Sequence, residues 1–441
     1  MRDYRNVADA VAADIDGGRL RPGDRLPTQR AFAREHGLAP STVHRVYREL
    51  VRRGLVTGEV GRGTFVRAAG EFAALGEPAD QPVDLELSVP AVPGQFAPLA
   101  ADLAPLLRPD VLAAALRPVG VAGTPGARAA AAHALTRSGW TPDGGRILFA
   151  GSGRQAIAGA VAALVPPGGR LGVEEFTYPV VRALAGRLGV TLVPLPVDDD
   201  GLRPDGVAAA HRAGGLHAVY LQPTLHNPLC VTMSGARRSD LADLAGRLDL
   251  RLIEDAVWSY LDPAATPLAA LAPDHTILVD SLSKRLAPGL TTGFAVAPPH
   301  LTDRLAEALR SGAWTPQRFA LDAATRWIAD GTLAAVEAAK RADARARQDL
   351  VRTLLGGLGV RTAPGAYLCW WELPRRWRPE VFAGAAARRG IAVTVGSAFT
   401  AAPHRTPNAV RLGLASPPLD VLAQALATLA TLARSAPEDI D

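Results

Sequence analysis

Hydrophobic residues near the start of the chain recur every three or four positions, which is the spacing of an amphipathic helix. The first such stretch covers residues 4–15. Thr28 is a candidate N-cap for a second helix that ends near Glu35, and Gly37 supplies a tight turn. A third helix then extends to about Arg53. Two short helices joined at a glycine predict a helix-turn-helix motif, whose second helix would enter the major groove of DNA.

Two short apolar runs follow this motif and predict a β-hairpin. They cover residues 55–57 and 64–66, and Arg62 lies at the tip of the glycine-rich turn between them. A hairpin in this place is a wing. Beyond it, residues 68–95 are rich in Ala, Gly, Pro and acidic residues and show little periodicity. We therefore expect a head over residues 1–67 and a linker over 68–95.

From about residue 96 the pattern changes to short apolar runs that alternate with helical stretches. This alternation is typical of an α/β domain built around a sheet. The predicted strands are 146–150, 170–173, 191–195, 218–221, 250–254, 276–280 and 293–297. We call this part of the chain, residues 96–441, the body.

Charge is distributed unevenly along the 441 residues. The head contains thirteen arginines and eight acidic residues, a net charge of +5, and the whole chain also has a net charge of +5. The rest of the chain is therefore close to neutral. A basic head on a neutral body indicates that the head alone binds a polyanion such as DNA.

Other features of the composition favour a cytoplasmic location. Residues 1–16 are charged throughout and lack the apolar centre of a signal peptide. The longest uncharged stretch, residues 213–236, contains two prolines and is not a membrane span. Cys230 and Cys369 are far apart in the sequence, which favours a reducing compartment without structural disulfides. Neither cysteine has the spacing of a metal site.

Lysine is almost absent from the chain. Of 48 basic residues, only Lys284 and Lys340 are lysines. An arginine guanidinium stays protonated and is a poor nucleophile, whereas a desolvated lysine amine can lose its proton and attack an aldehyde. Lys340 lies in a charged helical run and is interpreted as a lysine kept by chance. Lys284 is therefore the candidate nucleophile.

Two features at the ends of predicted strands suit a flat, phosphorylated ligand. A glycine-rich turn, residues 151–155, leads from a strand into a helix, and such a turn offers N–H groups to phosphate. An ordinary strand-to-helix turn has the same pattern. Tyr178 follows the next strand and could stack on a flat ring, although packing in the core is the simpler interpretation.

Two further strand ends carry a carboxylate and hydroxyl groups. Asp255 ends a buried strand, where an acid is costly unless a cation faces it. A protonated pyridine nitrogen is such a cation, and the carboxylate would keep that nitrogen protonated. Ser281 and Ser283 lie beside Lys284, where their hydroxyls can bind phosphate oxygens. These residues together favour a pyridine-ring phosphate as the partner of the lysine.

The head resembles the GntR family of winged-helix regulators, with a long and specific match over residues 18–66. The resemblance and the side-chain chemistry imply contacts with DNA from the turn, the recognition helix and the wing. The implied DNA-binding residues are Arg25, Arg30, Thr42, His44, Arg45, Arg48 and Arg62. Arginines suit phosphates, whereas Thr42, His44 and Arg45 can reach base edges. Pro40 stands where many family members have an arginine, so one contact of the family is missing here.

The body resembles the fold type I aminotransferases from about Arg117 to the C-terminus. The order and spacing of the strand-end residues carry this resemblance, together with the sequence Asn-Ala-Val-Arg-Leu-Gly at 408–413. It implies a large domain with a mostly parallel sheet and a smaller C-terminal α+β domain from about residue 310. It also implies pyridoxal 5′-phosphate as the cofactor.

The family pattern implies a role for each candidate residue. Lys284 would form a Schiff base with the cofactor, Asp255 would pair with the ring nitrogen, and Asn227 would bond the ring hydroxyl. Tyr178 would stack on the ring, and Arg411 would bind the carboxylate of a ligand. The implied phosphate-binding residues are Ser281, Ser283, Ser152, Gly153, Arg154 and Gln155.

Three positions depart from the family pattern. Thr291 stands where the family has a phosphate-binding arginine. Trp258 stands where it has a tyrosine that bonds the ring hydroxyl, and an indole N–H can donate but not accept. Residues 118–122 replace a motif whose tyrosine reaches the phosphate of a partner subunit. We hypothesise that Arg154 replaces the missing cation, with Arg285 as a second candidate; the alternative is that Arg154 is an ordinary surface residue.

Head and body together resemble the MocR subfamily of GntR regulators, in which the body senses ligands through pyridoxal phosphate and the chains form a head-to-tail dimer. The preferred hypothesis is a transcriptional regulator that binds double-stranded DNA and responds to pyridoxal phosphate or an amino compound. One alternative is an active aminotransferase with an appended head, which Trp258 argues against. Another is a regulator whose body has lost the cofactor. Thr291 and Trp258 favour this alternative, and the retained Lys284, Asp255 and Asn227 oppose it.

Overall fold

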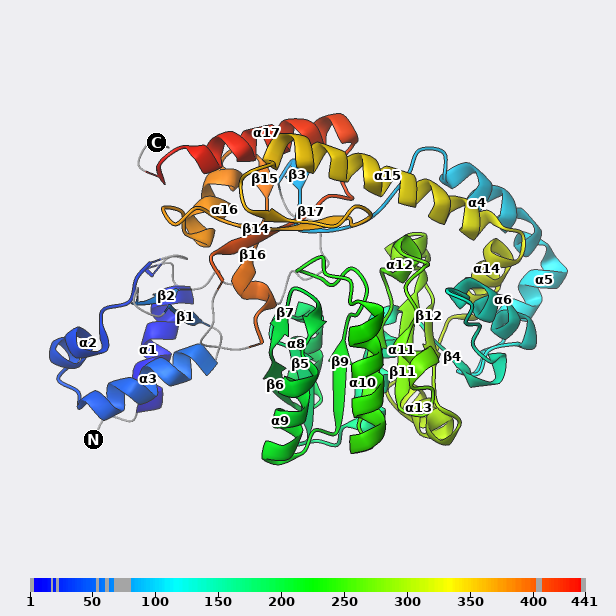
Figure 1. Ribbon diagram of the computed structural model, residues 1–441, viewed down its shortest axis with the longest axis horizontal. Helices are drawn as coiled ribbons and strands as arrows, with labels where there is room; N and C mark the ends of the chain where they lie inside the picture. Colours follow the sequence, from blue (N-terminus) through cyan, green and yellow to red (C-terminus); the bar gives the residue numbers. More distant parts are fainter. Residues whose placement is uncertain are drawn as a thin grey trace.

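The computed structural model describes residues 4–16, 19–20, 24–52, 55–59, 63–66, 81–401 and 407–437. Arg62, the residue expected at the tip of the wing, lies outside these described residues. The head lies beside the body, and the body consists of a large sheet domain with a smaller domain stacked on it (Figure 1).

The head has the elements that the hydrophobic pattern predicts. Its helices are α1 (Tyr4–Asp16), α2 (Gln29–His36) and α3 (Pro40–Arg52), and its strands are β1 (Val56–Glu59) and β2 (Gly63–Val66). The Thr28 hydroxyl caps α2 by accepting a hydrogen bond from the Ala31 N–H at 3.2 Å. Gly37 then turns the chain with a φ of 62°. The winged helix-turn-helix is therefore confirmed.

The recognition helix α3 is held by one apolar face. Val43, Val46, Tyr47 and Leu50 are buried in the core of the head, at helical spacing. Burial of one face leaves the opposite face of α3 to solvent. The sequence of the helix thus separates residues that hold the head together from residues that can contact a partner.

A seven-stranded sheet forms the centre of the large domain, in the order β4-β12-β11-β10-β9-β5-β6. The strands are β4 (Ile147–Ala150), β5 (Arg170–Glu174), β6 (Thr191–Leu195), β9 (Ala218–Leu221), β10 (Arg251–Asp255), β11 (Thr276–Ser281) and β12 (Gly293–Val296). Only β12 runs antiparallel to its neighbours in this sheet. Every predicted strand is present, within one residue at each end.

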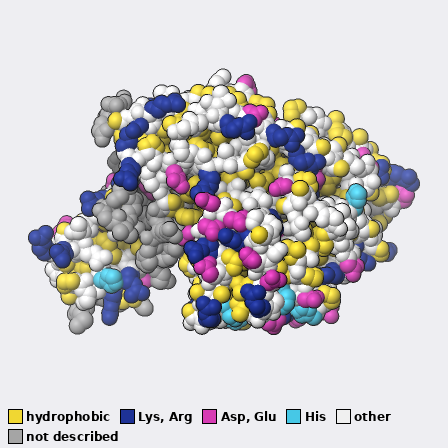
Figure 2. Space-filling model, in the orientation of Figure 1, with side chains coloured by type: hydrophobic (Ala, Val, Ile, Leu, Met, Phe, Trp, Pro, Cys, Tyr) yellow, Lys and Arg dark blue, Asp and Glu magenta, His cyan; other side chains and the backbone are white. Residues whose placement is uncertain are grey.

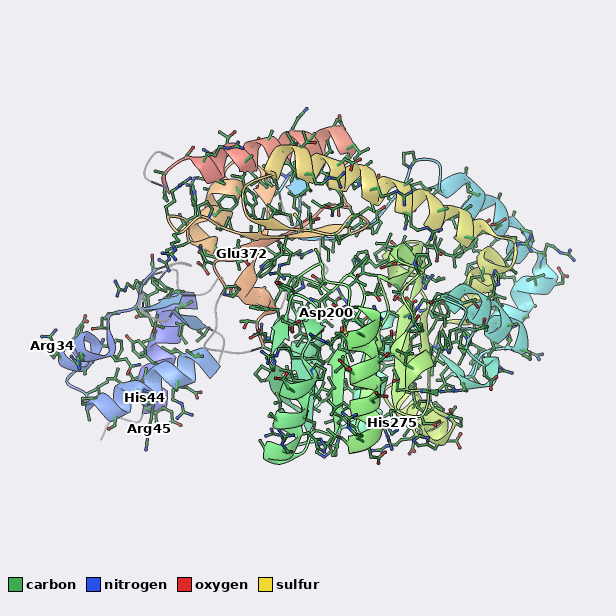
Figure 3. All side chains as sticks on the ribbon, in the orientation of Figure 1. Arg34, His44, Arg45, Asp200, His275 and Glu372 are labelled. Carbon is green, nitrogen blue, oxygen red and sulfur yellow. The ribbon has the colours of Figure 1, made fainter. Side chains whose placement is uncertain are left out.

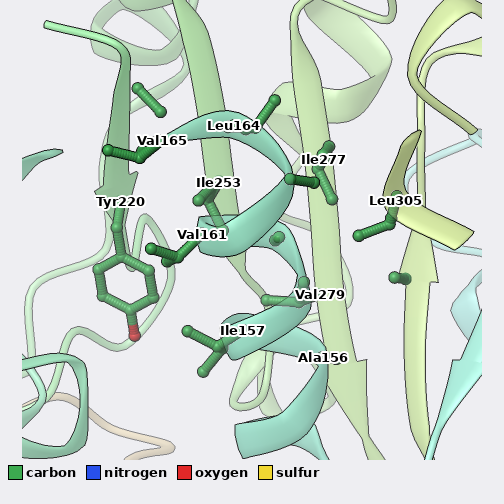
Figure 4. Close-up of a cluster of buried hydrophobic side chains, with 14 of the residues drawn as sticks. Ala156, Ile157, Val161, Leu164, Val165, Tyr220, Ile253, Ile277, Val279 and Leu305 are labelled. Atoms are coloured by element: carbon green, nitrogen blue, oxygen red, sulfur yellow. The ribbon is translucent and has the colours of Figure 1, made fainter. Parts of the chain in front are cut away.

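Helix α7 (Gly153–Leu164) covers part of one face of the large sheet. Its apolar residues pack across β9, β10 and β11 (Figure 4). The residues in contact are Ile157, Val161 and Leu164 on the helix and Tyr220, Ile253, Ile277 and Val279 on the strands. Because both faces of a parallel sheet are covered, its strands read as continuous apolar runs, and loops at their carboxyl ends are free to form a site.

The other helices of the large domain surround this sheet. They are α4 (Phe96–Leu103), α5 (Pro109–Ala115), α6 (Pro125–Leu135), α8 (Pro179–Arg187), α9 (Pro204–Gly214), α10 (Gly235–Leu248), α11 (Leu268–Leu271), α12 (Leu282–Arg285), α13 (Thr302–Ser311) and α14 (Arg318–Ala329). A short hairpin, β7 (Val197–Asp198) and β8 (Gly201–Leu202), lies beside them. Both faces of the sheet thus carry helices, as in other doubly wound domains.

The small domain has a four-stranded sheet in the order β13-β14-β17-β16. Its elements are β13 (Val360–Arg361), β14 (Leu368–Glu372), α16 (Pro379–Ala387), β15 (Ile391–Ala392), β16 (Thr394–Val395), β17 (Ala409–Gly413) and α17 (Leu419–Arg434). The 24-residue helix α15 (Thr332–Leu355) begins in the core of the large domain and ends in the core of the small one. None of the helices in the described part of the chain is long and apolar enough to cross a membrane.

A segment close to the head is built into the small domain. Strand β3 (Val83–Asp84) pairs in parallel with β15, and the Leu85 carbonyl accepts a hydrogen bond from the Gly413 N–H at 2.6 Å. The Leu87 carbonyl accepts another from the Ser416 hydroxyl, also at 2.6 Å. We call residues 83–89 the strap. Although the sequence analysis places it in the linker, the strap packs against the body.

Candidate functional site

Lys284 lies at the carboxyl edge of the large sheet, on the short helix α12 that follows β11. Its amine donates a hydrogen bond to the carbonyl of Ser88 in the strap and lies 5.5 Å from the centre of the Trp258 ring. Removal from water, with Arg411 and Arg154 nearby, lowers the pKa of Lys284 to about 7. A large share of the amine is therefore neutral near pH 7, as a nucleophile requires.

Asp255 ends the neighbouring strand β10 and is 4% exposed. Its Oδ2 atom accepts hydrogen bonds from the Tyr220 hydroxyl at 2.6 Å and from Gln222 Nε2 at 2.8 Å. Its Oδ1 atom accepts one from the Val257 N–H at 3.1 Å. Burial nevertheless raises the pKa of Asp255 to about 6. A carboxylate fixed in this way can accept a further hydrogen bond from a cation such as a pyridinium N–H.

Asn227 is tied to the same network. Its backbone N–H donates to Gln222 Oε1 at 3.1 Å, so Gln222 contacts both Asn227 and Asp255. Its side-chain Oδ1 atom is buried and has no hydrogen-bond partner among the described residues. A buried acceptor without a partner costs free energy, and the hydroxyl of a ligand ring would satisfy it.

The serines predicted to bind phosphate meet at the start of α7 and α12. Ser152 is the N-cap of α7, and a Cβ atom on Gly153 would come within 2.8 Å of the Ser281 hydroxyl. Only glycine allows this close approach. Ser283 and Thr291 share a hydrogen bond of 2.7 Å between their hydroxyls. The amino end of a twelve-residue helix and several hydroxyls thus form a cup that suits an anion.

Arg154 and Gln155 follow Ser152 on the first turn of α7. The Gln155 N–H donates to the Ser152 hydroxyl at 3.3 Å, and Arg154 Nε donates to the Tyr178 hydroxyl at 3.2 Å. The Arg154 guanidinium is also near enough to Lys284 to lower the pKa of its amine. Two of the predicted residues, Arg154 and Tyr178, are therefore in direct contact at the edge of the cup.

Arg285, the second candidate for the phosphate-binding cation, forms ion pairs with two carboxylates outside the cup. It is 3% exposed and forms ion pairs with Asp280 at 2.6 Å and with Glu337 at 2.5 Å. Neighbouring side chains on a helix diverge, so Arg285 lies away from the cup although Lys284 faces it. Arg154 remains as the candidate on the cup itself.

Arg411, on β17, is a residue that the small domain contributes to the site. Its Nη2 atom donates to the Glu86 carbonyl of the strap at 2.6 Å and to the Thr394 hydroxyl at 3.0 Å. Its Nε atom is buried without a hydrogen-bond partner among the described residues. A carboxylate that approached this guanidinium could bind it in the bidentate way that arginine allows.

Several residues of the site escape the sequence analysis. Tyr220 and Gln222 hold Asp255, and Gln222 is visible in the sequence only as the residue after a strand. Glu174, at the end of β5, accepts hydrogen bonds from the Gln222 N–H at 3.1 Å and contacts His226 Nε2 at 3.0 Å. The strap contributes backbone carbonyls, which have no signal in the sequence. Glu174 and Gln222 could have been predicted from the sequence only by their positions at the ends of predicted strands.

The predicted DNA-binding residues lie on the outer side of the head. His44, Arg45 and Arg48 are exposed on α3, as are Arg25 and Arg30 before it, and Thr42 is partly exposed. Figure 3 shows His44 and Arg45 pointing away from the small domain, and Figure 2 shows basic side chains on the same lower face of the head. His44, Arg45 and Arg48 lie on the face of α3 that the core leaves free.

Gly63 explains how Arg25 reaches the wing. The φ of Gly63 is +126°, and a Cβ atom there would come within 2.7 Å of Arg25 Nε. Glycine therefore lets the Arg25 side chain lie across the start of β2. The exposed Arg25 side chain therefore lies beside the start of β2, where a guanidinium can pair with a phosphate.

Comparison with known proteins agrees with both parts of the chain. Residues 3–66 match the family described as bacterial regulatory proteins, gntR family, and residues 120–429 match aminotransferase class I and II. The chain belongs to the aminotransferase class I and II family. A GntR head on such a body is the domain order of the MocR subfamily of GntR regulators.

Relatives with the same arrangement extend over nearly the whole chain. It is 29% identical over 436 residues to the uncharacterized HTH-type transcriptional regulator YdeF of Bacillus subtilis, covering 97% of this chain and 94% of that protein. It is 26% identical to the vitamin B6 salvage pathway transcriptional repressor PtsJ of Salmonella typhimurium, covering 89% and 90%. The solved kynurenine aminotransferase of Pyrococcus horikoshii shares the fold, with a TM-score of 0.73 and 23% identity over 85% of this chain and 96% of that one.

Pyridoxal 5′-phosphate is the cofactor of this fold, and the residues present fit it. The partnerless Oδ1 atom of Asn227 and the buried Asp255 carboxylate suit the ring hydroxyl and the ring nitrogen. The cup at the start of α7 suits the phosphate, and Lys284 supplies the amine. When bound, the cofactor supplies an aldehyde that condenses with primary amines and a ring that withdraws electrons.

Proposed function

We propose that this protein is a transcriptional regulator that binds an operator in double-stranded DNA and responds to pyridoxal 5′-phosphate, or to an amino compound that reacts with it. The strap carries this proposal. Lys284 donates to the carbonyl of Ser88, and Arg411 donates to the carbonyl of Glu86. Lys284 and Arg411, both implied in ligand binding, therefore hold the strap, which is the part of the linker that packs against the body.

Ligand binding would have to change these bonds. A carbonyl compound that condenses with the Lys284 amine replaces its hydrogen bond to Ser88, and a carboxylate on Arg411 competes with the carbonyl of Glu86. Each replacement loosens or moves the strap. Because the strap continues along the chain into the linker, the head would be repositioned, and a regulator needs only such a difference between two states.

A second route leads from the strap to the wing. Strand β3 of the strap pairs with β15, and β15 follows helix α16. Arg378 at the start of α16 lies over the ring of Phe65 in β2, with 3.4 Å between the guanidinium carbon and the ring centre. The small domain thus contacts the wing directly, and a shift of β15 would be felt there.

We further propose that the protein works as a head-to-tail homodimer. Large apolar side chains are exposed at the end of the body that carries α4 and α5 (Figure 1). They are Phe96, Leu107, Leu112 and Leu116, which are 62%, 61%, 39% and 82% exposed. A second copy of the chain would cover this patch, and two heads would match a two-fold symmetric operator. Molar mass in solution tests this directly: a monomer at micromolar concentration would contradict it.

The cofactor part of the proposal is tested by absorption. Purified wild-type protein mixed with pyridoxal 5′-phosphate should develop a visible band that borohydride reduction fixes to the protein, and peptide mapping should place the label on Lys284. Absence of a reducible band would favour a body that works without the cofactor. The regulatory part is tested by measuring DNA affinity with and without pyridoxal 5′-phosphate on a fragment selected by the protein from random DNA.

An active aminotransferase is the second candidate, since Lys284, Asp255 and Arg411 are all in place. Trp258 argues against it, because its indole cannot accept the hydrogen bond that a phenol at this position would share with the ring hydroxyl. Transfer of an amino group from an amino acid to a 2-oxo acid at an ordinary enzymatic rate, on the order of 1 per second or faster, would favour this candidate.

A further inference from the structure

The two lysines of the chain meet in the structure. Lys340, in the middle of α15, is 0% exposed. Its amine donates hydrogen bonds to the carbonyl of Lys284 at 3.0 Å and to the carbonyl of Leu286 at 2.5 Å. The interpretation of Lys340 as a lysine kept by chance on a charged helix is therefore wrong, because its side chain is buried against the turn that carries the nucleophile.

These two carbonyls need a partner. Helix α12 has only four residues, Leu282–Arg285, and the last carbonyls of any helix lack donors within the helix. Here a donor comes from α15. Lys340 thus caps α12 and fixes the backbone at Lys284.

Lys340 is itself held from both sides. One turn earlier on α15, Glu337 forms an ion pair with Arg285 at 2.5 Å, so two side chains of α15 bind α12. The Tyr367 hydroxyl donates at 2.8 Å to the backbone carbonyl of Lys340. The Lys340 amine stays close to its two acceptors, because Tyr367 holds the Lys340 backbone and the side chain is fully buried.

The protonation state of Lys340 does not alter this role. Burial, with Lys284 close by, lowers the pKa of Lys340 to about 7. A protonated amine has three N–H groups and a neutral amine has two. Either form can therefore serve both carbonyls.

We propose that Lys340 is a positioning residue for Lys284, holding its backbone turn so that the Lys284 amine reaches the aldehyde of the bound cofactor. The reaction is a condensation in which a carbon–nitrogen double bond forms and water leaves. This inference rests on the proposed function, since it requires the cofactor at Lys284. Misplacement of a reacting group by about 1 Å can cost roughly 100-fold in reactivity, so a cap of this kind matters for the covalent step.

The test compares two cofactor forms on the variant Lys340→Met, which keeps the length and burial of the side chain and removes its donors. Pyridoxal 5′-phosphate can condense with Lys284, whereas pyridoxamine 5′-phosphate has an amine in place of the aldehyde and cannot. We expect the affinity for the aldehyde form to fall about tenfold or more while that for the amine form stays near wild type. The rate at which the reducible band appears should fall with it.

Gln348→Met is the matched control. Gln348 lies on the same helix, is also 0% exposed, and donates to the carbonyls of Ala366 at 2.6 Å and Leu368 at 3.1 Å, away from α12. This variant should lose comparable packing and hydrogen bonding but keep the wild-type ratio of the two affinities. If Lys340→Met does not fold, Lys340→Gln retains N–H donors on a shorter side chain, and its ratio should fall between wild type and complete loss of the preference.

A wild-type ratio of the two affinities in Lys340→Met would overturn the inference, whether both affinities are unchanged or both fall by the same factor. This result would mean that Lys340 stabilises the fold without positioning the amine. A wild-type protein that forms no reducible band would instead contradict the proposed function. The two failures are therefore distinguishable.

Discussion

Arg378 of the small domain lies over the aromatic ring of Phe65 in the wing, with 3.4 Å between the guanidinium carbon and the ring centre. Phe65 is 4% exposed, so the contact is part of a closed interface. Arg378 is also the N-cap residue of α16, the helix that precedes the strand paired with the strap. We infer that this pair of residues is one contact through which a change in the small domain reaches the wing.

Replacing Arg378 should therefore weaken communication without weakening cofactor binding. A cation–π contact contributes about 0.5–2 kcal/mol, so Arg378→Ala should reduce the effect of pyridoxal 5′-phosphate on DNA affinity by about twofold or more, up to its complete loss. Affinity for the cofactor should stay near wild type. DNA binding by fluorescence anisotropy and cofactor binding by absorption measure the two quantities separately.

Arg375→Ala provides the control, because Arg375 is exposed and close in sequence, whereas the cation that lies over Phe65 among the described residues is Arg378. It should keep the full cofactor effect. An Arg378→Ala protein that responds to the cofactor as strongly as Arg375→Ala would show that the contact is not part of the route.

Arg154→Ala should weaken phosphate binding selectively. A charge-assisted hydrogen bond contributes about 1.5–3 kcal/mol, so affinity for pyridoxal 5′-phosphate should fall roughly 10- to 150-fold. Affinity for pyridoxal, which lacks the phosphate, should change little. Unchanged binding of the phosphorylated form would rule out Arg154 as the replacement cation.

Thr291→Arg in the Arg154→Ala background tests the same idea by gain of function. Thr291 contacts Ser283 through a hydrogen bond of 2.7 Å, so an arginine at this position can reach the phosphate cup. The double variant should recover a large part of the lost affinity for pyridoxal 5′-phosphate. In the wild-type background the same change should help less, because two cations would then share one phosphate.

The reaction of Lys284 should depend on pH near neutrality. Its pKa is lowered from 10.5 to about 7, so the neutral amine increases as pH rises through 7. The rate of covalent capture should rise about tenfold between roughly pH 6 and 8 and then level off, whereas an ordinary lysine would keep gaining up to about pH 10. Arg411→Gln removes a nearby cation, so its curve should lie at higher pH. A rate that still rises steeply above about pH 9 in the wild type would contradict the low pKa.

The sequence predicts the frame of the site because strand ends leave a clear signal. Asp255 and Lys284 each follow a run of buried apolar residues, and parallel strands bring their carboxyl ends to one edge. The helix-turn-helix is equally visible in the sequence. Val43, Val46 and Leu50 have the spacing of a buried helical face, and the polar residues His44 and Arg45 lie between them on the exposed face. Local periodicity therefore predicts the elements of the fold, and the rarity of lysine together with a strand-end position predicts the nucleophile.

Contacts between distant segments leave no such signal. Ser88 and Lys284 are 196 residues apart, and the strap contacts Lys284 through a backbone carbonyl that any residue has. Lys340 is a different case. The buried residues of α15 include Leu333, Val336, Ala344 and Val351, and Lys340 lies at the same helical spacing. Periodicity could have placed it on the buried face, but its charged neighbours in the sequence hide this.

We propose that cofactor chemistry at Lys284 controls DNA binding. The most direct test measures the affinity of wild type and of Lys284→Ala for one selected DNA fragment, with and without pyridoxal 5′-phosphate. Allosteric coupling typically changes affinity by about 5- to 150-fold, and we expect a change of about fivefold or more in the wild type. Lys284→Ala should bind the fragment and show no cofactor effect. A cofactor response of wild-type size in Lys284→Ala, or none in wild-type protein that carries the reducible band, would contradict the account.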